Sequence, residues 1–397
     1  MDQDKKQKAI EAAIEQIKKQ TKDPEAVVRL GDEIAYHNST TVDWLGTFAQ
    51  GKYSTDKFSL YGMGGLSTIK YSYQDHFTVA DSVINANAIT TFQLKGGAVY
   101  NLDDRMSAFI NAGYVQKPPI LDNVISYDGT VSTDPDNEKF TSMEVGGEYN
   151  SGLVSIKGSY YNTQWKDRNL TKSVTTGQGD SGDTDIIYLT GVNQSHSGVE
   201  VETKVALHEM VDLDVAISNG VWKFDGDAKG DYQEMEYNED GQIIGQTTTE
   251  YEYALDGLKV GDMPQFGLNF GLTASPVEGA AVQLTYRYYD LFFADWSPTS
   301  RSFSSESDAD RGQPFRIPSY GLVDLNASYD LPFDFNGVTA QVVLNVRNLL
   351  DEVYIQDALD NSRYNAYPFR VNDHSANAAE VYLGMPTTYN LGLSIKF

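Results

Sequence analysis

The sequence of 397 residues predicts an all-β fold, a transmembrane antiparallel up-and-down β-barrel with about 13 strands present and a short N-terminal helical segment. Three observations predict this fold. From Ile34 onward, apolar and polar residues alternate with a period of two, as in strands that have one apolar face. The connections between these strands are alternately short and long. The last strand, Pro386 to Phe397, is apolar on one face up to an aromatic final residue.

The composition suits many strands joined by turns, with 26 Tyr, 17 Phe and 34 Gly against 12 Pro. The net charge of −26 excludes the clustered Lys and Arg on which nucleic-acid binding depends. The absence of cysteine excludes disulfides and thiolate metal sites. No segment has the roughly 18 apolar residues of a membrane helix. The mean hydropathy of −0.41 still fits a barrel, whose lumen, loops and turns are polar.

The first 33 residues differ from the rest of the chain. Ile10, Ile14 and Ile17 recur at helical spacing among Lys and Glu residues, which predicts a short amphipathic helix. The segment is no signal peptide, because it has neither an apolar core nor a small-residue cleavage site. The predicted division is therefore a helical segment at 1–33 and barrel strands at 34–397.

The period of two predicts thirteen strands after this segment. They are 34–53, 57–74, 89–101, 104–115, 139–150, 152–166, 195–207, 210–224, 264–275, 279–296, 318–331, 337–349 and 386–397. The two faces are clearest in the second half of the chain, where Val199, Val201 and Val205 alternate with Glu200 and Lys204. A soluble protein would expose such a charged face to solvent, whereas its repetition along the chain favours a polar lumen.

The connections separate these two interpretations. Short turns such as 54–56 and 276–278 alternate with long connections. The long ones are 75–88, 116–138, 167–194, 225–263, 297–317 and 350–385. A bacterial outer-membrane barrel has short periplasmic turns at one rim and long external loops at the other. A soluble sandwich has no reason to keep that order six times.

The final strand carries a further signal. Asn390, Gly392, Ile395 and Phe397 follow the order polar-x-Gly-x-x-apolar-x-aromatic. This order resembles the terminal signal by which the barrel-assembly machinery of bacteria recognises its substrates. A soluble sheet ending in this way would need a core to cover its apolar face, and its edge would be unpaired.

Several segments resemble the barrel of TonB-dependent outer-membrane receptors, most closely those of Bacteroidetes type. They are GTFAQGKYSTDKFSLYGMGG (46–65), INAGYVQKPPILDNVIS (110–126), EKFTSMEVGGEYN (138–150), NQSHSGVEVETKV (193–205), VDLNASYDL (323–331) and VRNLLDEVYI (346–355). No single motif is decisive, but their order, together with the terminal Phe397, makes the match strong. Residues 34–397 all fit the pattern.

The resemblance implies a protein of the bacterial outer membrane, embedded in its lipid, that imports a scarce small-molecule ligand. A metal chelate, by default a ferric siderophore, is the expected ligand, and the TonB complex supplies energy through a plug domain. Import of a glycan or peptide is the alternative within the family, and a passive porin or adhesin is the alternative outside it. Such barrels have about 22 strands. The sequence shows thirteen and no plug, so we expect the C-terminal part of a barrel, with 1–33 as an external loop. We also expect a gap between the strands at 34–53 and 386–397, or a loosely closed barrel with a wide empty lumen.

No residues are assigned to catalysis, to a cofactor or to a metal. The five histidines, His37, His76, His196, His208 and His374, lie in no metal or triad spacing, so an enzyme is not expected.

The segment from Asp225 to Asp231 places oxygen ligands at alternate positions, as a calcium loop does, but Lys229 interrupts them. Residues 225–263 hold eleven Asp or Glu against two Lys, which favours an acidic solvated loop that repels anions.

Aromatic residues near the strand ends suit interfacial girdles. They are Tyr286, Tyr288, Trp296, Tyr329 and Tyr389. Trp165 and Trp222 face inward by parity or belong to loops, and structural packing is favoured for them over stacking on a ligand. The ligand-binding residues remain unassigned.

Overall fold

The computed structural model describes residues 27, 29–30, 37–76, 82–125, 129–132, 135–176, 183–237, 243–332, 337–361 and 373–396. The helix predicted within 1–33 and the terminal Phe397 thus lie outside the described residues. The division of the chain at residue 33 stays a prediction.

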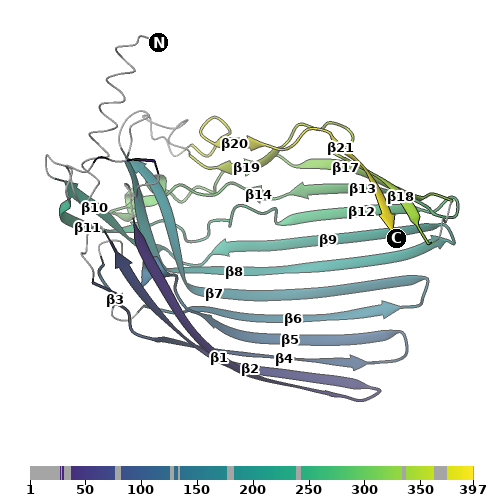
Figure 1. The fold of residues 1–397 in the computed structure, drawn as a ribbon, viewed down its shortest axis with the longest axis horizontal. Helices are drawn as coiled ribbons and strands as arrows, with labels where there is room; N and C mark the ends of the chain where they lie inside the picture. The colour runs from purple at the N-terminus through teal and green to yellow at the C-terminus, as the bar shows by residue number, and fades with distance from the viewer. Residues whose placement is uncertain are drawn as a thin grey trace, which may run out of the picture.

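All thirteen predicted strands are present and form one curved wall (Figure 1). Each wall strand pairs antiparallel with the next wall strand along the chain. The wall strands are β1 (Asn38–Ser54), β2 (Phe58–Asp75), β4 (Ile89–Asn101), β5 (Met106–Lys117), β6 (Glu138–Asn150), β7 (Val154–Thr176), β8 (Asp183–His208), β9 (Val211–Phe224), β12 (Phe266–Ala274), β13 (Ala280–Asp290), β17 (Tyr320–Asp330), β18 (Thr339–Arg347) and β21 (Thr388–Lys396).

The register places apolar residues in rows on one face of the wall. Leu272 of β12 lies between Leu213 of β9 and Leu284 of β13, and Leu284 also pairs with Leu325 of β17. Leu272 and Leu284 are exposed. The opposite face carries the charged and amide side chains of the same strands, because successive side chains alternate. The apolar face is the one that lipid covers in a membrane barrel.

Most residues of the predicted girdle lie on the outer face of the wall, and one does not. Tyr286, Tyr329 and Tyr389 are exposed on the apolar face, where their strand neighbours are Phe270, Val342 and Val346. Trp296 is only 1% exposed. The predicted strand 279–296 in fact ends at Asp290, because Leu291 has a φ of 50° and leaves the extended conformation. Trp296 therefore belongs to a loop that folds inward.

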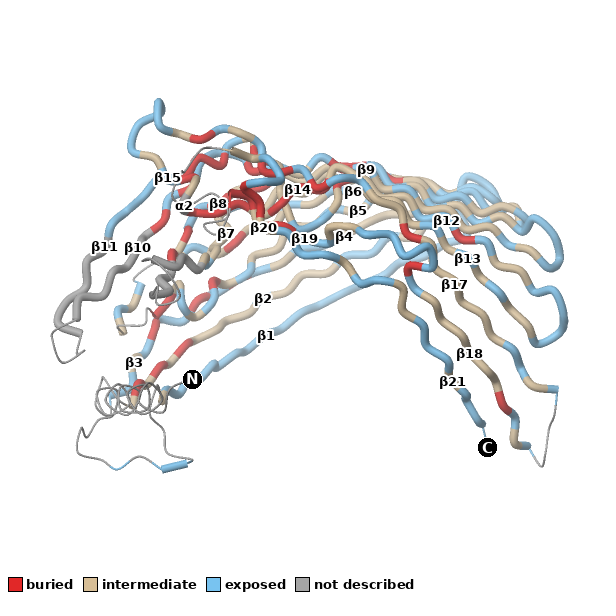
Figure 2. The backbone as a smooth tube through the Cα atoms, turned by 90° about the horizontal axis from the view of Figure 1, so that it is seen from above, coloured by how far each residue is buried: buried red, intermediate tan, exposed pale blue. Residues whose placement is uncertain are grey.

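The long connections contain structure of their own at one end of the wall. Their elements are β3 (Ile84–Asn85), η1 (Leu121–Asn123), β10 (Ala228–Tyr237), β11 (Ile243–Tyr253), β14 (Phe292–Phe293), α2 (Pro298–Arg301), β15 (Ser302–Phe303), η2 (Glu306–Asp308), β16 (Arg316–Ile317), β19 (Ile355–Leu359) and β20 (Glu380–Leu383). Many of the buried residues gather at this end, which we call the loop end (Figure 2).

Strands β7 and β8 are longer than predicted because they continue beyond the wall at the loop end. There β8 pairs with β10, and β10 forms a hairpin with β11. The segment 225–263, predicted to be a solvated acidic loop, is thus largely a hairpin. Its Lys229 forms ion pairs with Glu250 and Glu252 across the two strands.

The wall is open. No ladder joins β1 to β21 among the described residues, whose pairings run from β1–β2 to β18–β21. Figure 2 shows the two strands at opposite ends of the arch. The expected gap between the first and last strands is therefore confirmed. Within the described part of the chain, no helix is long and apolar enough to cross a membrane.

Candidate functional site

The concave face of the wall carries hydrogen bonds between side chains of neighbouring strands. The Tyr61 hydroxyl donates to the Asn111 amide oxygen at 3.1 Å, and the Asn111 amide nitrogen donates to Glu144 at 3.1 Å. The Trp222 indole donates to the Tyr161 hydroxyl at 2.8 Å. A polar inner surface of this kind orients groups toward the lumen instead of toward lipid.

Trp165 is fixed near the loop end of this surface. Its ring packs on Phe140 with centroids 4.5 Å apart, and its Nε1–H donates to Glu138 at 3.0 Å. Glu138 is 1% exposed and also accepts a bond from Lys117 at 3.1 Å. Both tryptophans predicted to face inward, Trp165 and Trp222, therefore have structural partners, as favoured by the sequence.

A β-bulge beside Trp165 turns a cation toward the same surface. Trp165 pairs with Gln194 and Arg168 pairs with Val192, so two residues of β7 oppose one of β8. Asp167, inside the bulge, has a φ of 55°. Because the side-chain period is two, the extra residue places Arg168 on the same face as Trp165.

Arg168 and His196 share an acceptor on this surface. Arg168 Nη1 donates to the Gln194 side-chain oxygen at 3.2 Å, and the His196 ring nitrogen lies 3.2 Å from the same oxygen. The Arg168 guanidinium carbon is 4.1 Å from the Trp165 ring centroid, and the His196 ring is 5.8 Å from that of Trp222. We call Trp165, Arg168, Gln194, His196 and Trp222 the inner-face cluster. Cations over aromatic rings and ring faces are common recognition groups for charged or planar ligands.

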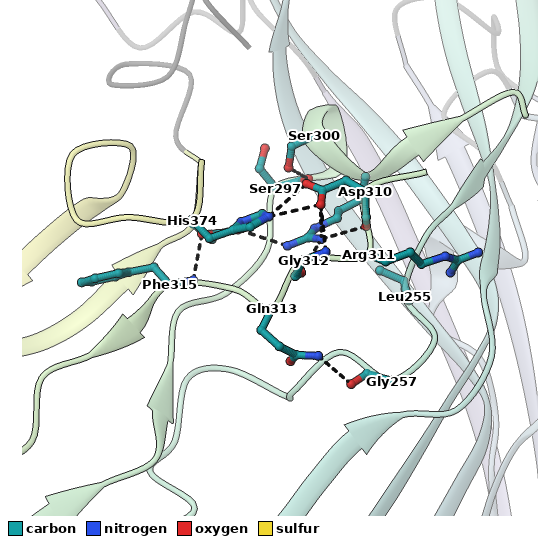
Figure 3. Close-up of polar contacts among 12 residues, drawn as sticks. Leu255, Gly257, Ser297, Ser300, Asp310, Arg311, Gly312, Gln313, Phe315 and His374 are labelled. Carbon is teal, nitrogen blue, oxygen red and sulfur yellow. Dashed lines mark hydrogen bonds and ion pairs between the residues drawn. The ribbon is translucent and has the colours of Figure 1, made fainter. Parts of the chain in front are cut away.

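A buried ionic network joins two of the long connections, and Figure 3 labels two of its members, Asp310 and His374. Arg301 and Asp360 are fully buried, and Arg301 Nη2 lies 3.2 Å from the Asp360 carboxylate. His374 Nδ1 is 2.8 Å from Asp360, and His374 Nε2 is 3.2 Å from Asp310. Asp360 also accepts the backbone N–H of Phe315 at 2.8 Å. We call Arg301, Asp310, Asp360 and His374 the loop-end network.

The protonation of this network follows from its hydrogen bonds. Bonds to Asp310 and then to Asp360 raise the pKa of His374 to about 9, so that the ring is cationic at neutral pH. Burial acts to raise the pKa of Asp310, but the bonds from His374 and from the Gly312 backbone outweigh it and leave the pKa below its usual value. Two cations then balance two carboxylates in a site largely closed to water.

A second ionic contact links the hairpin β10–β11 to the same region. Arg311 donates to both oxygens of Asp227, at 2.5 and 2.8 Å, and also to Glu306. The bond from Arg311 is the main cause of a lowered pKa at Asp227. Asp227 also accepts the backbone N–H groups of Leu255 and Asp256. The carboxylate at the centre of the calcium-like segment is thus committed to Arg311 and to the backbone.

The hydrophobic core of the loop end forms around Trp296. Phe224 and Tyr253 pack against its ring, at centroid distances of 6.2 and 6.3 Å. Lys172 lies 5.0 Å from the ring centroid and forms an ion pair with Asp295. Strand β7, the hairpin and the connection between β13 and β17 are thereby held together.

The C-terminal assembly signal stays a prediction, with part of it described. Asn390 and Gly392 lie on the inner face, opposite Asn345 and Val343 of β18, while Ile395 is exposed on the outer face. The remaining member of the signal, Phe397, lies outside the described residues. Among the described residues, no group of three or more His, Cys, Asp or Glu could hold a metal ion.

Sequence reasoning missed Arg168 and the loop-end network. The inward direction of Arg168 results from one extra residue in β7, which a period of two does not reveal. The network joins Arg301 to residues 9 and 59 positions later in the sequence, with no periodic pattern between them. One signal was present for the first of these, the charged run Lys166-Asp167-Arg168 directly after an inward aromatic residue.

The wall, its apolar outer face and its loop end define an outer-membrane β-barrel protein. The chain belongs to the family described as TonB dependent receptor-like, beta-barrel, whose model matches residues 18–349. This membership confirms the resemblance to TonB-dependent receptors noted in the sequence, and it places the protein in the bacterial outer membrane, whereas the Bacteroidetes type stays a prediction. No curated protein matches the chain.

Solved structures share the fold at low sequence identity. The copper transporter OprC has a TM-score of 0.58 at 16% identity, over 90% of this chain and 48% of that one. The ferric-catecholate import receptor Fiu from E. coli has a TM-score of 0.57 at 14% identity, over 94% and 46%. The ferric citrate transporter FecA has a TM-score of 0.58 at 12% identity, over 93% and 47%. The chain thus spans about half the length of the structures it matches.

Proposed function

We propose that the protein acts in the import of a scarce ligand across the outer membrane, with a ferric siderophore as the default ligand. The observation that supports this is the inner-face cluster, a cation and aromatic rings directed into the lumen of a receptor-type barrel. Two of the similar structures are named for ferric-catecholate import and ferric citrate transport, and a third for copper. The role is transport and not catalysis.

Energy for import would come from the TonB complex acting on a plug domain inside the barrel. Import of a glycan or peptide is the second candidate within the family. The rings of Trp222 and Tyr161 favour it, because sugars and peptide side chains also pack on aromatic faces.

Growth of a deletion strain separates these candidates. Under iron limitation the strain should lose growth on at least one ferric chelate from a panel of catecholate, carboxylate and hydroxamate chelates. Expression of the gene should restore that growth, provided that TonB is present. A strain that grows normally on every ferric chelate but fails on a glycan or peptide source would exclude siderophore import. If the restored growth does not depend on TonB, a TonB-dependent receptor is excluded and a passive porin is favoured.

A further inference from the structure

Arg168 is an inward cation that forms no ion pair with a described residue. Among the described residues, no carboxylate lies within ion-pair distance of its guanidinium, and its hydrogen bond goes to the neutral side chain of Gln194. The side chain is half-buried over the Trp165 ring. A cation in such a partly dry position is costly unless an opposite charge completes it.

The nearby carboxylates are mostly committed to other cations. Glu138 pairs with Lys117 and also accepts the Trp165 indole, and Asp295 pairs with Lys172. Asp262 is the neighbouring carboxylate that forms no ion pair with a described residue, and it influences Arg168 only from beyond contact distance. These carboxylates attract Arg168 only from beyond contact distance, burial opposes its charge, and none of them accepts a bond from its N–H donors.

The donors themselves fit a particular chemistry. Of the five N–H donors of a guanidinium, the Nη1 bond to Gln194 engages one, and among described residues no other acceptor is in place. The planar fork of Arg binds two oxygens of a carboxylate, or of a similar anion, side by side. Packing over the Trp165 ring holds the guanidinium in place before a ligand arrives, which reduces the entropy lost on binding.

We propose that Arg168, held by the bulge at Asp167 and by the ring of Trp165, is a specificity residue that binds an anionic oxygen pair of the imported ligand. The class of ligand is an acidic chelate with carboxylate or catecholate oxygens, as opposed to a neutral hydroxamate chelate. That the ligand is imported rests on the proposed function, whereas the anion site rests on the geometry of β7 and β8. His196 and Trp222, on the adjacent strands, provide the surface on which the rest of the ligand packs.

The test measures binding to the protein purified from outer membranes in detergent, by intrinsic tryptophan fluorescence. The probes are ferric citrate, a ferric tris-catecholate and a neutral ferric trihydroxamate. Arg168→Gln should weaken binding of the acidic chelate that binds best by about tenfold to a hundredfold, because a charge-assisted bidentate contact is lost. Arg168→Lys should lose part of this affinity, since it keeps the charge without the planar fork. Arg105→Gln, the same change at an exposed turn, should leave the affinity within about twofold of wild type.

Correct folding of each variant is checked by heat-modifiable mobility on a gel, and Arg168→Lys keeps the test informative where Arg168→Gln does not fold. Failure of both acidic chelates to bind the wild type overturns the proposal, as does equal affinity of wild type and Arg168→Gln. If binding depends on Arg168 but the cells do not grow on the chelate, the anion site stands and the import function is rejected. Normal import by Arg168→Gln would retain the function and reject the site.

Discussion

Single side chains set the free energy of local opening at the loop end. Replacing Arg301 by Met removes one of the two cations that balance the buried carboxylates of Asp310 and Asp360 and leaves His374 alone with both, which costs about 3–5 kcal/mol. We expect the local opening free energy of the loops to fall by this amount, measured by hydrogen exchange at the Phe315 amide.

Arg311→Met is the matched control. The Arg311 side chain is 36% exposed and its ion pairs face solvent, so the same change should cost about 1 kcal/mol or less. Equal protection of the Phe315 amide in Arg301→Met and wild type would show that the buried network does not hold the loops.

The charge of His374 makes this stability depend on pH. Its folded pKa of about 9 lies above the unfolded value of about 6.5. The stabilisation is therefore fully present below about pH 6.5 and is lost as the pH rises through about 9. Hydrogen exchange at the Gly312 and Phe315 amides is compared between wild type and His374→Gln at the same pH. At pH 6 the wild-type amides should be better protected, and by pH 10 the two proteins should be protected almost equally. A difference between the two proteins that stays constant over this range would contradict the assigned protonation.

At the scale of elements, the close approach of strands β7, β8 and β9 sets a limit on side-chain size. A Cβ at Gly198 would lie 2.6 Å from the Tyr161 hydroxyl and 2.8 Å from the Asn219 carbonyl oxygen. Gly198→Ala should therefore displace Tyr161 from Trp222 and destabilise the wall by about 1–3 kcal/mol.

The neighbouring Gly158 provides the comparison, because a Cβ there has no contact closer than 3.9 Å. The temperature at which the folded band disappears on a heat-modifiability gel should fall for Gly198→Ala and stay unchanged for Gly158→Ala. If Gly198→Ala and Gly158→Ala lost the folded band at the same temperature, the inner wall would be able to accommodate a Cβ at Gly198.

The elements were predictable where a single rule governs them. Alternation specified all thirteen wall strands, because each has one apolar and one polar face. It did not show that β7 and β8 continue past the wall, since that extension depends on the partner strand β10. It also placed Trp296 in a girdle, because a run of aromatic residues from Tyr286 onward gives no sign of the left-handed residue Leu291. Contacts between loops, such as Arg301 with Asp360, depend on tertiary packing and leave no local pattern.

At the scale of the whole molecule, the cost of introducing a charged residue into a wall strand should depend on whether the residue faces lipid or the lumen more than on its position along the strand. Leu284 lies in the centre of the outer apolar rows, and Leu284→Arg should cost about 2–4 kcal/mol near the bilayer midplane. Gln283→Arg, one residue earlier, faces the lumen and should be tolerated. The amounts of folded protein in outer-membrane fractions provide the measurement. Similar losses for both variants would argue against lipid on the outer face.

The loop-end network also limits how such a protein can be altered by exchange of its parts. Arg301 comes from the connection 297–317, while Asp360 and His374 come from 350–385, and Arg311 reaches back to Asp227 in 225–263. A graft of 297–317 or of 350–385 alone into a related barrel would bring a buried charge without its counter-charge, whereas the Arg311–Asp227 pair faces solvent. These two segments, separate in the gene, therefore form one unit of inheritance, and chimeras should retain the loop end only when both are transferred together.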